Sequence, residues 1–331
     1  MSPRLRTRLG AAVTALAASL ALAACGTDAE PTTGASAGAA FPVRLTHKYG
    51  TTEITAAPRR VVTLGLSDAD AVLALGVKPV GVVDWFEEKP YGKWPWAQPA
   101  WGGTAPAIVG LRDEYNLEKV AAARPDVIIA QYSGMKKEQY DTLSRIAPVV
   151  AQPVGFADYQ APWRDMSRVI GRALGQSAKM DQLIADVDTK FAAARTAHPG
   201  WAGRTVAIAE IYEAGKFSAF HPNDPKMIFM KELGFTASPA YSRAVGSQNV
   251  ADIGYERFDV LEGDRLIWFV TGDGTREQLA ANTTYQQLGV AREHRDLYLD
   301  YENPPVATAM SFNTVLSIPY ALDRIQPQLG Q

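Results

Sequence analysis

Short apolar runs and stretches with helical spacing alternate along most of this chain. Arg60–Leu64, Lys78–Val83 and Val127–Ala130 are short and rich in β-branched residues, which is typical of buried strands. Leu117–Ala123 and Lys136–Ile146 have helical spacing instead. Strands that alternate with helices of about ten residues predict βαβ units and a mostly parallel sheet.

The middle of the chain carries the longest helical pattern. Trp163–Leu174 predicts a helix that stops at Gly175, and Ser177 is a suitable N-cap for a second helix that reaches about His198. The apolar residues of this second helix recur every three or four positions and therefore share one face. They are Met180, Leu183, Ile184, Val187 and Phe191. About 21 residues at ~1.5 Å each make a helix of roughly 30 Å.

The alternation resumes after the long helix. Thr205–Ile211 and Leu266–Val270 predict strands, and Ser311–Ile325 predicts a terminal helix. A hairpin over Phe41–Ile54, with its turn at Gly50-Thr51, is expected at the other end. We therefore predict an α/β fold with two Rossmann-like lobes joined by a single long backbone helix. The expected boundaries are an N-terminal lobe at 41–175, a linking helix at 176–199 and a C-terminal lobe at 200–331.

The first 25 residues form a separate pattern. Arginines at positions 4, 6 and 8 precede an uncharged, mostly apolar run over Leu9–Ala24, which is shorter than the ~20 residues that span a bilayer. Cys25, the only cysteine, follows directly. Leu-Ala-Ala-Cys at 22–25 resembles the lipobox of bacterial lipoprotein signal peptides. The resemblance implies cleavage of residues 1–24 and attachment of a diacylglyceryl lipid to the Cys25 sulfur. The alternative is an ordinary signal with an incidental cysteine.

Residues 25–40 are expected to form a flexible tether. Positions 26–40 hold no large apolar side chain, so they cannot bury enough surface to offset the entropy lost on ordering. No later apolar run is long enough to cross a membrane. We therefore expect a folded body held at the extracytoplasmic face of the cell membrane by the lipid on Cys25.

Charge and composition exclude some partners. Only three of the 33 basic residues and none of the 35 acidic residues precede Cys25, so the remaining chain has a formal charge of −5. No basic stripe of the kind that binds nucleic acid is present. At 47% hydrophobic residues, the chain can bury a substantial core without disulfides. We expect a monomer that does not bind nucleic acid.

Eight short segments, in order along the chain, resemble the solute-binding proteins of ABC transporters for iron-siderophores and vitamin B12. They are His-Lys-Tyr-Gly-Thr-Thr-Glu-Ile at 47–54, Pro-Arg-Arg-Val-Val at 58–62, Leu-Glu-Lys-Val at 117–120, Arg-Pro-Asp-Val-Ile-Ile at 124–129, Ile-Ala-Pro-Val-Val at 146–150, Leu-Gly-Phe at 233–235, Tyr-Glu-Arg-Phe at 255–258 and Asp-Arg-Leu-Ile at 264–267. The similarity runs from about residue 43 to 328. It implies a ligand cleft between the two lobes and delivery of the ligand to a membrane permease.

A loop rich in aromatic residues follows the strand that ends near Val83. Its aromatic side chains are Trp85, Phe86, Tyr91, Trp94, Trp96 and Trp101. Ligands of α/β folds bind at the carboxyl edge of the sheet, where this loop begins. Aromatic rings supply large apolar surface for a bulky ligand, although they could equally pack the loop against the lobe. Trp85 is the best ligand candidate because it lies nearest the strand end, and Tyr91 is a second.

Further candidate ligand-binding residues follow strands at the same edge of the sheets. Tyr132 and Ser133 follow the strand that ends at Ala130, whereas Tyr212 and Phe220 belong to the second lobe. Arg243 lies in a predicted loop after Phe235 and could face an anionic ligand, although a surface arginine is the commoner outcome. Phenol and guanidinium groups suit a ferric chelate, because its coordinating oxygens carry negative charge and accept hydrogen bonds.

Glu118 and Glu256 are expected to lie on another surface. They fall in the Leu-Glu-Lys-Val and Tyr-Glu-Arg-Phe motifs, and in the family that the chain resembles an acidic residue of each lobe engages arginines of the permease. The resemblance therefore implies that these two glutamates dock the permease. Favourable interaction with a helix N-terminus is an alternative reason for their position.

Signals for catalysis and for a metal site are poor. Gly65-Leu66-Ser67-Asp68-Ala69 lies between a strand and a helix but lacks the second glycine of a nucleophile elbow, so Ser67 is expected to be an N-cap. The four histidines lack metal-ligand spacing, and no phosphate-binding loop is present. We expect no catalytic residue and no metal ligand, so the protein is expected not to be an enzyme.

The leading hypothesis is a lipid-anchored receptor that captures a ferric siderophore and delivers it to an ABC permease for iron uptake. The siderophore, not the protein, would hold the iron. A hydroxamate is favoured over a catecholate, which is more negative and would need a more basic site. The alternatives are haem, for which Tyr132 or Tyr212 could be an axial ligand, and cobalamin. A lipid-anchored secreted hydrolase is a more remote alternative.

Overall fold

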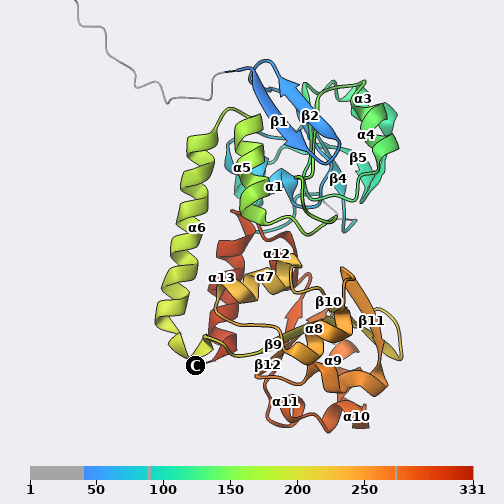
Figure 1. Ribbon diagram of the computed structural model, residues 1–331, viewed down its shortest axis with the longest axis vertical. Helices are drawn as coiled ribbons and strands as arrows, with labels where there is room; N and C mark the ends of the chain where they lie inside the picture. Colours follow the sequence, from blue (N-terminus) through green and yellow to red (C-terminus); the bar gives the residue numbers. More distant parts are fainter. Residues whose placement is uncertain (1–40, 88–90, 273, 331) are drawn as a thin grey trace, which may run out of the picture. The chain divides into compact units, whose positions relative to one another are not determined.

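The computed structural model describes residues 41–87, 91–272 and 274–330 (Figure 1). The expected signal peptide, the tether and Cys25 lie outside the described residues. All the described residues belong to one compact unit. No helix in the described part of the chain is long and apolar enough to cross a membrane.

An antiparallel hairpin opens the described chain. β1 (Val43–His47) pairs with β2 (Gly50–Ile54), and His47 lies opposite Gly50. The turn is therefore at Lys48 and Tyr49, so its prediction at Gly50-Thr51 was wrong. The error arose because glycine usually marks a turn, whereas Gly50 begins the second strand with a φ of +131°.

The N-terminal lobe contains a six-stranded sheet in the order β6-β5-β4-β3-β7-β8. All of its pairings are parallel except β5 with β6. The strands are β3 (Val61–Thr63), β4 (Gly81–Asp84), β5 (Ala107–Leu111), β6 (Glu114–Tyr115), β7 (Val127–Ala130) and β8 (Val149–Ala151). Four of them, β3, β4, β7 and β8, are buried at every position, as expected for parallel strands covered on both faces. The helices are α1 (Asp68–Ala74), α2 (Gln98–Trp101), α3 (Leu117–Ala122), α4 (Lys137–Leu143) and α5 (Trp163–Ala173).

A single long helix, α6 (Ser177–Ala197), follows α5 (Figure 1). Its buried face consists of Met180, Ile184, Val187, Phe191 and Ala194, at the spacing that the sequence predicts. The helix begins at Ser177 itself, so the predicted N-cap role of this serine was wrong. Gln176 occupies the cap position without a side-chain hydrogen bond to the helix.

The C-terminal lobe contains a five-stranded sheet in the order β11-β10-β9-β12-β13. The strands are β9 (Val206–Glu210), β10 (Lys216–Phe220), β11 (Val250–Gly254), β12 (Arg265–Val270) and β13 (Asp296–Asp300). β9, β12 and β13 are parallel, whereas β10 and β11 run antiparallel to their neighbours. The helical segments are η1 (Pro199–Trp201), α7 (Pro225–Glu232), α8 (Pro239–Val245), η2 (Tyr255–Leu261), α9 (Gly274–Ala280), α10 (Thr283–Gln286), α11 (Gly289–Arg292), α12 (Val306–Phe312) and α13 (Ser317–Leu329). The predicted α/β class with two lobes is confirmed.

The terminal helical region is two helices instead of the one predicted. Asn313 ends α12 with a φ of +49°, a left-handed conformation that asparagine tolerates better than most residues. After this break, Thr314 and α13 reach residues of the N-terminal lobe. The hydroxyl of Thr314 donates to Asp70 on α1 over 2.7 Å.

Most of the aromatic loop after β4 packs against this C-terminal segment. The ring centroids of Phe86 and Trp96 lie 5.9 and 5.5 Å from that of Phe312, and Trp96 also contacts Tyr320. Trp94, Trp96 and Trp101 are all buried. One buried core therefore runs through both lobes, and the division at 41–175, 176–199 and 200–331 stays a prediction.

Candidate functional site

Three aromatic side chains gather at the carboxyl ends of the strands in the N-terminal lobe. Trp85 follows β4, Tyr132 follows β7, and Tyr159 lies in the segment after β8. The Tyr159 ring lies 5.5 Å from Tyr132 and 6.1 Å from Trp85, centroid to centroid. Trp85 is half-buried, and its indole N–H has no hydrogen-bond partner within the described chain. We call these residues, with Asp113 and Arg112 described below, the N-lobe group.

Asp113, between β5 and β6, holds Tyr159 of this group in place. Its carboxylate accepts hydrogen bonds from the Tyr115 hydroxyl at 3.0 Å, the Gly134 amide at 3.1 Å and the Tyr159 hydroxyl. Burial, and then the Asp113 carboxylate, raise the pKa of Tyr159 above its ordinary value. The Tyr159 phenol is therefore protonated at neutral pH.

Asp68 fixes the loops beneath the N-lobe group. Its buried carboxylate accepts backbone N–H groups of Gly65 at 3.1 Å, Gln131 at 2.8 Å and Tyr132 at 3.1 Å. Burial raises its pKa to about 6, and the three N–H donors oppose that rise. A Cβ atom on Gly65 would lie 2.4 Å from Asp68 Oδ2, so this approach requires glycine. Ser67 occupies the N-cap position of α1, as predicted, but its side chain makes no hydrogen bond to the helix, and Asp68 joins the two loops instead.

In the C-terminal lobe, two phenols converge on one carboxylate at the ends of β9 and β13. The Tyr301 hydroxyl donates to Glu210 Oε2 over 2.5 Å. The phenol of Tyr212 is near the same carboxylate, and each group changes the pKa of the other. Glu210 is only 3% exposed, whereas Tyr212 is 76% exposed and faces solvent. We call Glu210, Tyr212 and Tyr301, with the neighbouring Asp224 and Lys226, the C-lobe group.

Lys226 and Asp224 form a buried ion pair beside Glu210. The Lys226 Nζ lies 3.1 Å from Asp224 Oδ1 and 4.0 Å from the centre of the Phe220 ring. Burial raises the pKa of Glu210, and the positive charge of Lys226 and the two phenols oppose that rise. Phe220 is 3% exposed and so lies beneath Lys226 rather than on the surface.

Two electrostatic interactions connect the N-lobe group with the C-lobe group. Burial most of all, and then the charges of Asp224 and Tyr159, raise the pKa of Tyr132. Burial of the hydroxyl and the Glu210 carboxylate raise the pKa of Tyr212, and the positive charge of Arg112 opposes them. Tyr132 and Asp224, and likewise Arg112 and Tyr212, therefore lie within electrostatic range of each other although they belong to different lobes.

Arg112 is exposed at the turn between β5 and β6, where its φ is +50°. Such a conformation is uncommon for a residue with a side chain. Its backbone N–H donates to the Asp84 carbonyl at 3.2 Å, which ties the turn to the end of β4. The turn thus holds the Arg112 side chain near the facing phenols.

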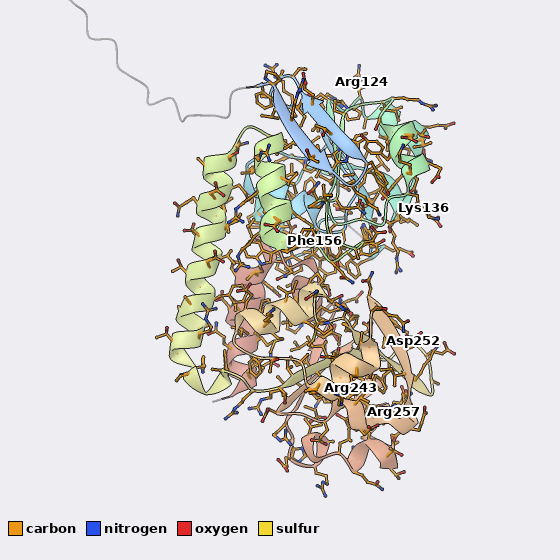
Figure 2. The ribbon with its side chains drawn as sticks, in the orientation of Figure 1. Arg124, Lys136, Phe156, Arg243, Asp252 and Arg257 are labelled. Carbon is orange, nitrogen blue, oxygen red and sulfur yellow. The ribbon has the colours of Figure 1, made fainter. Side chains whose placement is uncertain are left out.

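A segment after β8 also bridges the lobes. Gln160 donates to the side chain of Asn249, and the Asn249 amide donates to the Asp158 carbonyl at 3.1 Å. Next to this bridge lies a groove of about 570 Å³ whose lining includes Phe156, Trp163 and Lys231. Figure 2 shows Phe156 on this segment.

The structure brings some of the predicted ligand residues together and separates others. Trp85, Tyr132 and Tyr212 belong to the two facing groups. Ser133 is fully buried, and its hydroxyl donates to the Ala130 carbonyl at 3.2 Å. Tyr91 packs edge-on against Trp101, with centroids 5.9 Å apart. Arg243 is exposed on α8 (Figure 2).

Both predicted docking residues are exposed and lie in the first turns of helical segments. Glu118 lies in α3, where Asn116 caps the helix by accepting the Lys119 N–H at 2.9 Å. Glu256 lies in η2, and its carboxylate lies against the Gly254 backbone. Their docking role stays a prediction.

Sequence reasoning missed Arg112, Tyr159, Glu210 and Tyr301. Glu210 and Tyr301 come at the end of β9 and just after β13, so the strand-end rule that selected Tyr212 could have found them. Tyr159 follows β8 by eight positions, too far for that rule. Within 41–87, 91–272 and 274–330, no cluster of three His, Cys, Asp or Glu side chains is arranged to hold a metal ion.

Comparison with known proteins agrees with this architecture. Residues 61–302 match the family model described as periplasmic binding protein. A solute-binding protein from Mycobacterium smegmatis, known from its crystal structure, is 33% identical with a TM-score of 0.77, covering 87% of this chain and 97% of that one. The PiaA protein of Streptococcus pneumoniae, solved in complex with ferrichrome, is 28% identical with a TM-score of 0.75, covering 87% and 97% of the two chains.

A curated relative aligns over a shorter region. The YhfQ protein of Bacillus subtilis, described as a substrate-binding lipoprotein of an ABC transporter, is 36% identical over 149 residues. This alignment spans 45% of each chain, so less than half of that relative's length is matched. The family match covers well over half of the present sequence and agrees with the two-lobed fold. The chain therefore belongs to the periplasmic binding protein family, as its sequence resemblance predicted, and is a binding protein rather than an enzyme.

Proposed function

We propose that this protein is the solute-binding component of an ABC importer and captures a ferric siderophore between the N-lobe group and the C-lobe group. The observation that carries the proposal is the electrostatic interaction of Arg112 with Tyr212 and of Tyr132 with Asp224, each from one lobe to the other. Aromatic rings offer apolar contact to a bulky chelate, and a guanidinium binds the negative oxygens around the iron. The iron is cargo held by the siderophore.

A hydroxamate siderophore suits this site better than a catecholate. The charge of Arg112 acts on Tyr212, whereas Lys226 acts on Glu210 and is already paired with Asp224. A ferric trihydroxamate core is neutral, whereas a ferric tricatecholate core carries several negative charges that would need more positive partners. The solved complex of PiaA with ferrichrome, a hydroxamate, supports this choice.

The remaining predicted features complete the proposal. The lipid on Cys25 would hold the receptor at the extracytoplasmic face of the membrane, and Glu118 and Glu256 would dock the permease. Tethering keeps the receptor close to the permease, so a high local concentration replaces confinement in a compartment.

Titration of residues 26–331 with candidate ligands tests the proposal. This protein retains the compact unit, and Trp85 in the N-lobe group should report binding through quenched fluorescence. We expect saturable quenching by ferric hydroxamates at submicromolar concentration and weaker binding of ferric catecholates. A Soret shift with haem, or saturable binding of cobalamin alone, would overturn the assignment to siderophores.

A further inference from the structure

The C-lobe group contains a carboxylate that the capture of a negatively charged ligand does not require. Glu210 is 3% exposed, and it lies directly beneath the exposed Tyr212. Burying a carboxylate is costly unless it is paired and hydrogen-bonded. Tyr301, Tyr212 and the nearby charge of Lys226 supply that compensation.

The hydrogen bonds of Glu210 determine what the two phenols can offer to a ligand. An ionised carboxylate only accepts hydrogen bonds, and a phenol has a single proton to donate. Tyr301 donates that proton to Glu210 over 2.5 Å, and the phenol of Tyr212 is near the same carboxylate. The Tyr301 oxygen therefore presents lone pairs, which bind N–H groups and repel ligand oxygens.

The charges around Glu210 also favour N–H groups of a ligand over its oxygens. Asp224 and Glu210 are two acidic groups, and the one cation that acts on Glu210, Lys226, forms an ion pair with Asp224 at 3.1 Å. The buried part of the C-lobe group is therefore negative overall. Across from it, Arg112 supplies a positive charge from the other lobe. The site is thus polarised, with an anion-binding side and a side that favours hydrogen-bond donors.

We propose that Glu210 determines ligand specificity by making the C-lobe group selective for ferric chelates that carry a hydrogen-bond donor, and best an ammonium group, on the side away from Arg112. This inference rests on the proposed function. The chelate would place its iron-coordinating oxygens toward Arg112 and its N–H groups toward Tyr212 and Tyr301.

A matched pair of ligands tests the inference on residues 26–331. Ferric Desferal carries a pendant ammonium group, and its N-acetyl derivative replaces that charge with a neutral amide. We expect the unaltered protein to bind ferric Desferal roughly tenfold more tightly than the acetylated form, as for one hydrogen bond to a charged group. In Glu210→Gln the two affinities should become about equal.

Two further variants separate specificity from structure. Glu213→Gln removes the same charge from an exposed glutamate that pairs with Lys216 at 2.8 Å, and it should keep the preference. Tyr301→Phe removes one acceptor oxygen but leaves the Glu210 charge, so it should weaken the preference less than Glu210→Gln does. If Glu210 only supports the packing of Tyr301, Glu210→Gln and Tyr301→Phe will behave alike.

The outcomes distinguish this inference from the proposed function. A preference for the ammonium form that survives in Glu210→Gln, with an unchanged unfolding temperature, overturns the inference and leaves the function standing. Binding of ferric citrate but not of ferric Desferal by the unaltered protein would also overturn the inference and leave the proposed function standing. Failure to bind any ferric chelate overturns both.

Discussion

Asp70 on α1 accepts a hydrogen bond from the hydroxyl of Thr314, which lies 244 positions later in the chain and 2.7 Å away. The same carboxylate accepts the indole N–H of Trp96 at 2.9 Å. All three side chains are buried. This contact fastens the C-terminal helices to the N-terminal lobe, so it couples the two halves of the chain in the folded state.

Replacing Thr314 with Val should therefore destabilise the whole protein. The change keeps the shape of the side chain but leaves Asp70 without one of its donors, which costs about 1–3 kcal/mol of unfolding free energy. Urea denaturation followed by fluorescence measures the cost. Thr46→Val, on an exposed position of β1, is the matched control and should change the stability by less than about 0.5 kcal/mol. Equal effects of the two changes would contradict this account.

Asp68 should make the stability depend on pH in an unusual direction. Its pKa of about 6 in the folded chain exceeds the ordinary value of 3.8. At a pH between 3.8 and about 6, Asp68 keeps its proton in the folded chain but has lost it in the unfolded chain. The contribution of Asp68 to stability is thus fully present below about pH 3.8 and is lost as the pH rises through about 6, by about 3 kcal/mol.

The measurement is the unfolding free energy of the unaltered protein and of Asp68→Asn between pH 4 and 7. The difference between the two should change by roughly 2.4 kcal/mol over this range, because all other groups contribute to both proteins. Asparagine also places an N–H₂ group against one of the three backbone donors, so the variant should be less stable throughout. Parallel curves would show that Asp68 does not titrate in this range.

Arg112→Gln should lower the affinity for a ferric hydroxamate by about tenfold or more. The guanidinium supplies charge-assisted hydrogen bonds to the chelate oxygens that a neutral amide cannot replace. Fluorescence titration measures the effect, and Arg243→Gln is the matched comparison because the sequence assigned that arginine to the ligand as well. We expect the loss at Arg112 to be the larger. A greater loss of affinity in Arg243→Gln would indicate that the anion-binding side of the site lies at α8 instead.

Charge reversal at Glu118 and Glu256 should abolish uptake while leaving ligand binding intact. Both glutamates are exposed and contribute to neither facing group. The double variant Glu118→Lys, Glu256→Lys should bind the ferric siderophore with unchanged affinity and fail to support iron uptake in cells. Glu138→Lys with Glu277→Lys, at other exposed positions of helical first turns, serves as the control. Normal uptake by the Glu118/Glu256 variant would refute the docking role.

Replacing Cys25 with Ala should release the receptor from the membrane without altering its affinity. Cys25 precedes the described residues, which form one compact unit, so the folded body does not depend on it. Cell fractionation should find the variant in the soluble fraction, and the released protein should bind ligand as before. Continued membrane association would argue against the lipid anchor.

Several features of this protein follow from the sequence alone. The long helix α6 is readable because its apolar residues keep one face over many turns, and the parallel strands are readable as short buried runs. Trp85, Tyr132 and Tyr212 could be selected because strand ends in a parallel sheet meet at one edge. These are local patterns, which need no knowledge of how distant segments meet.

Only the tertiary structure decided which of the candidate side chains face each other. Trp94, Trp96 and Trp101 have the same local signature as Trp85, but they are buried, and Trp94 and Trp96 pack against Phe312 from the other end of the chain. The approach of Arg112 to Tyr212 and the shared carboxylate of Glu210 likewise depend on loops separated by about a hundred positions. Contacts of this kind are determined by the packing of the two lobes, because periodicity describes only residues a few positions apart.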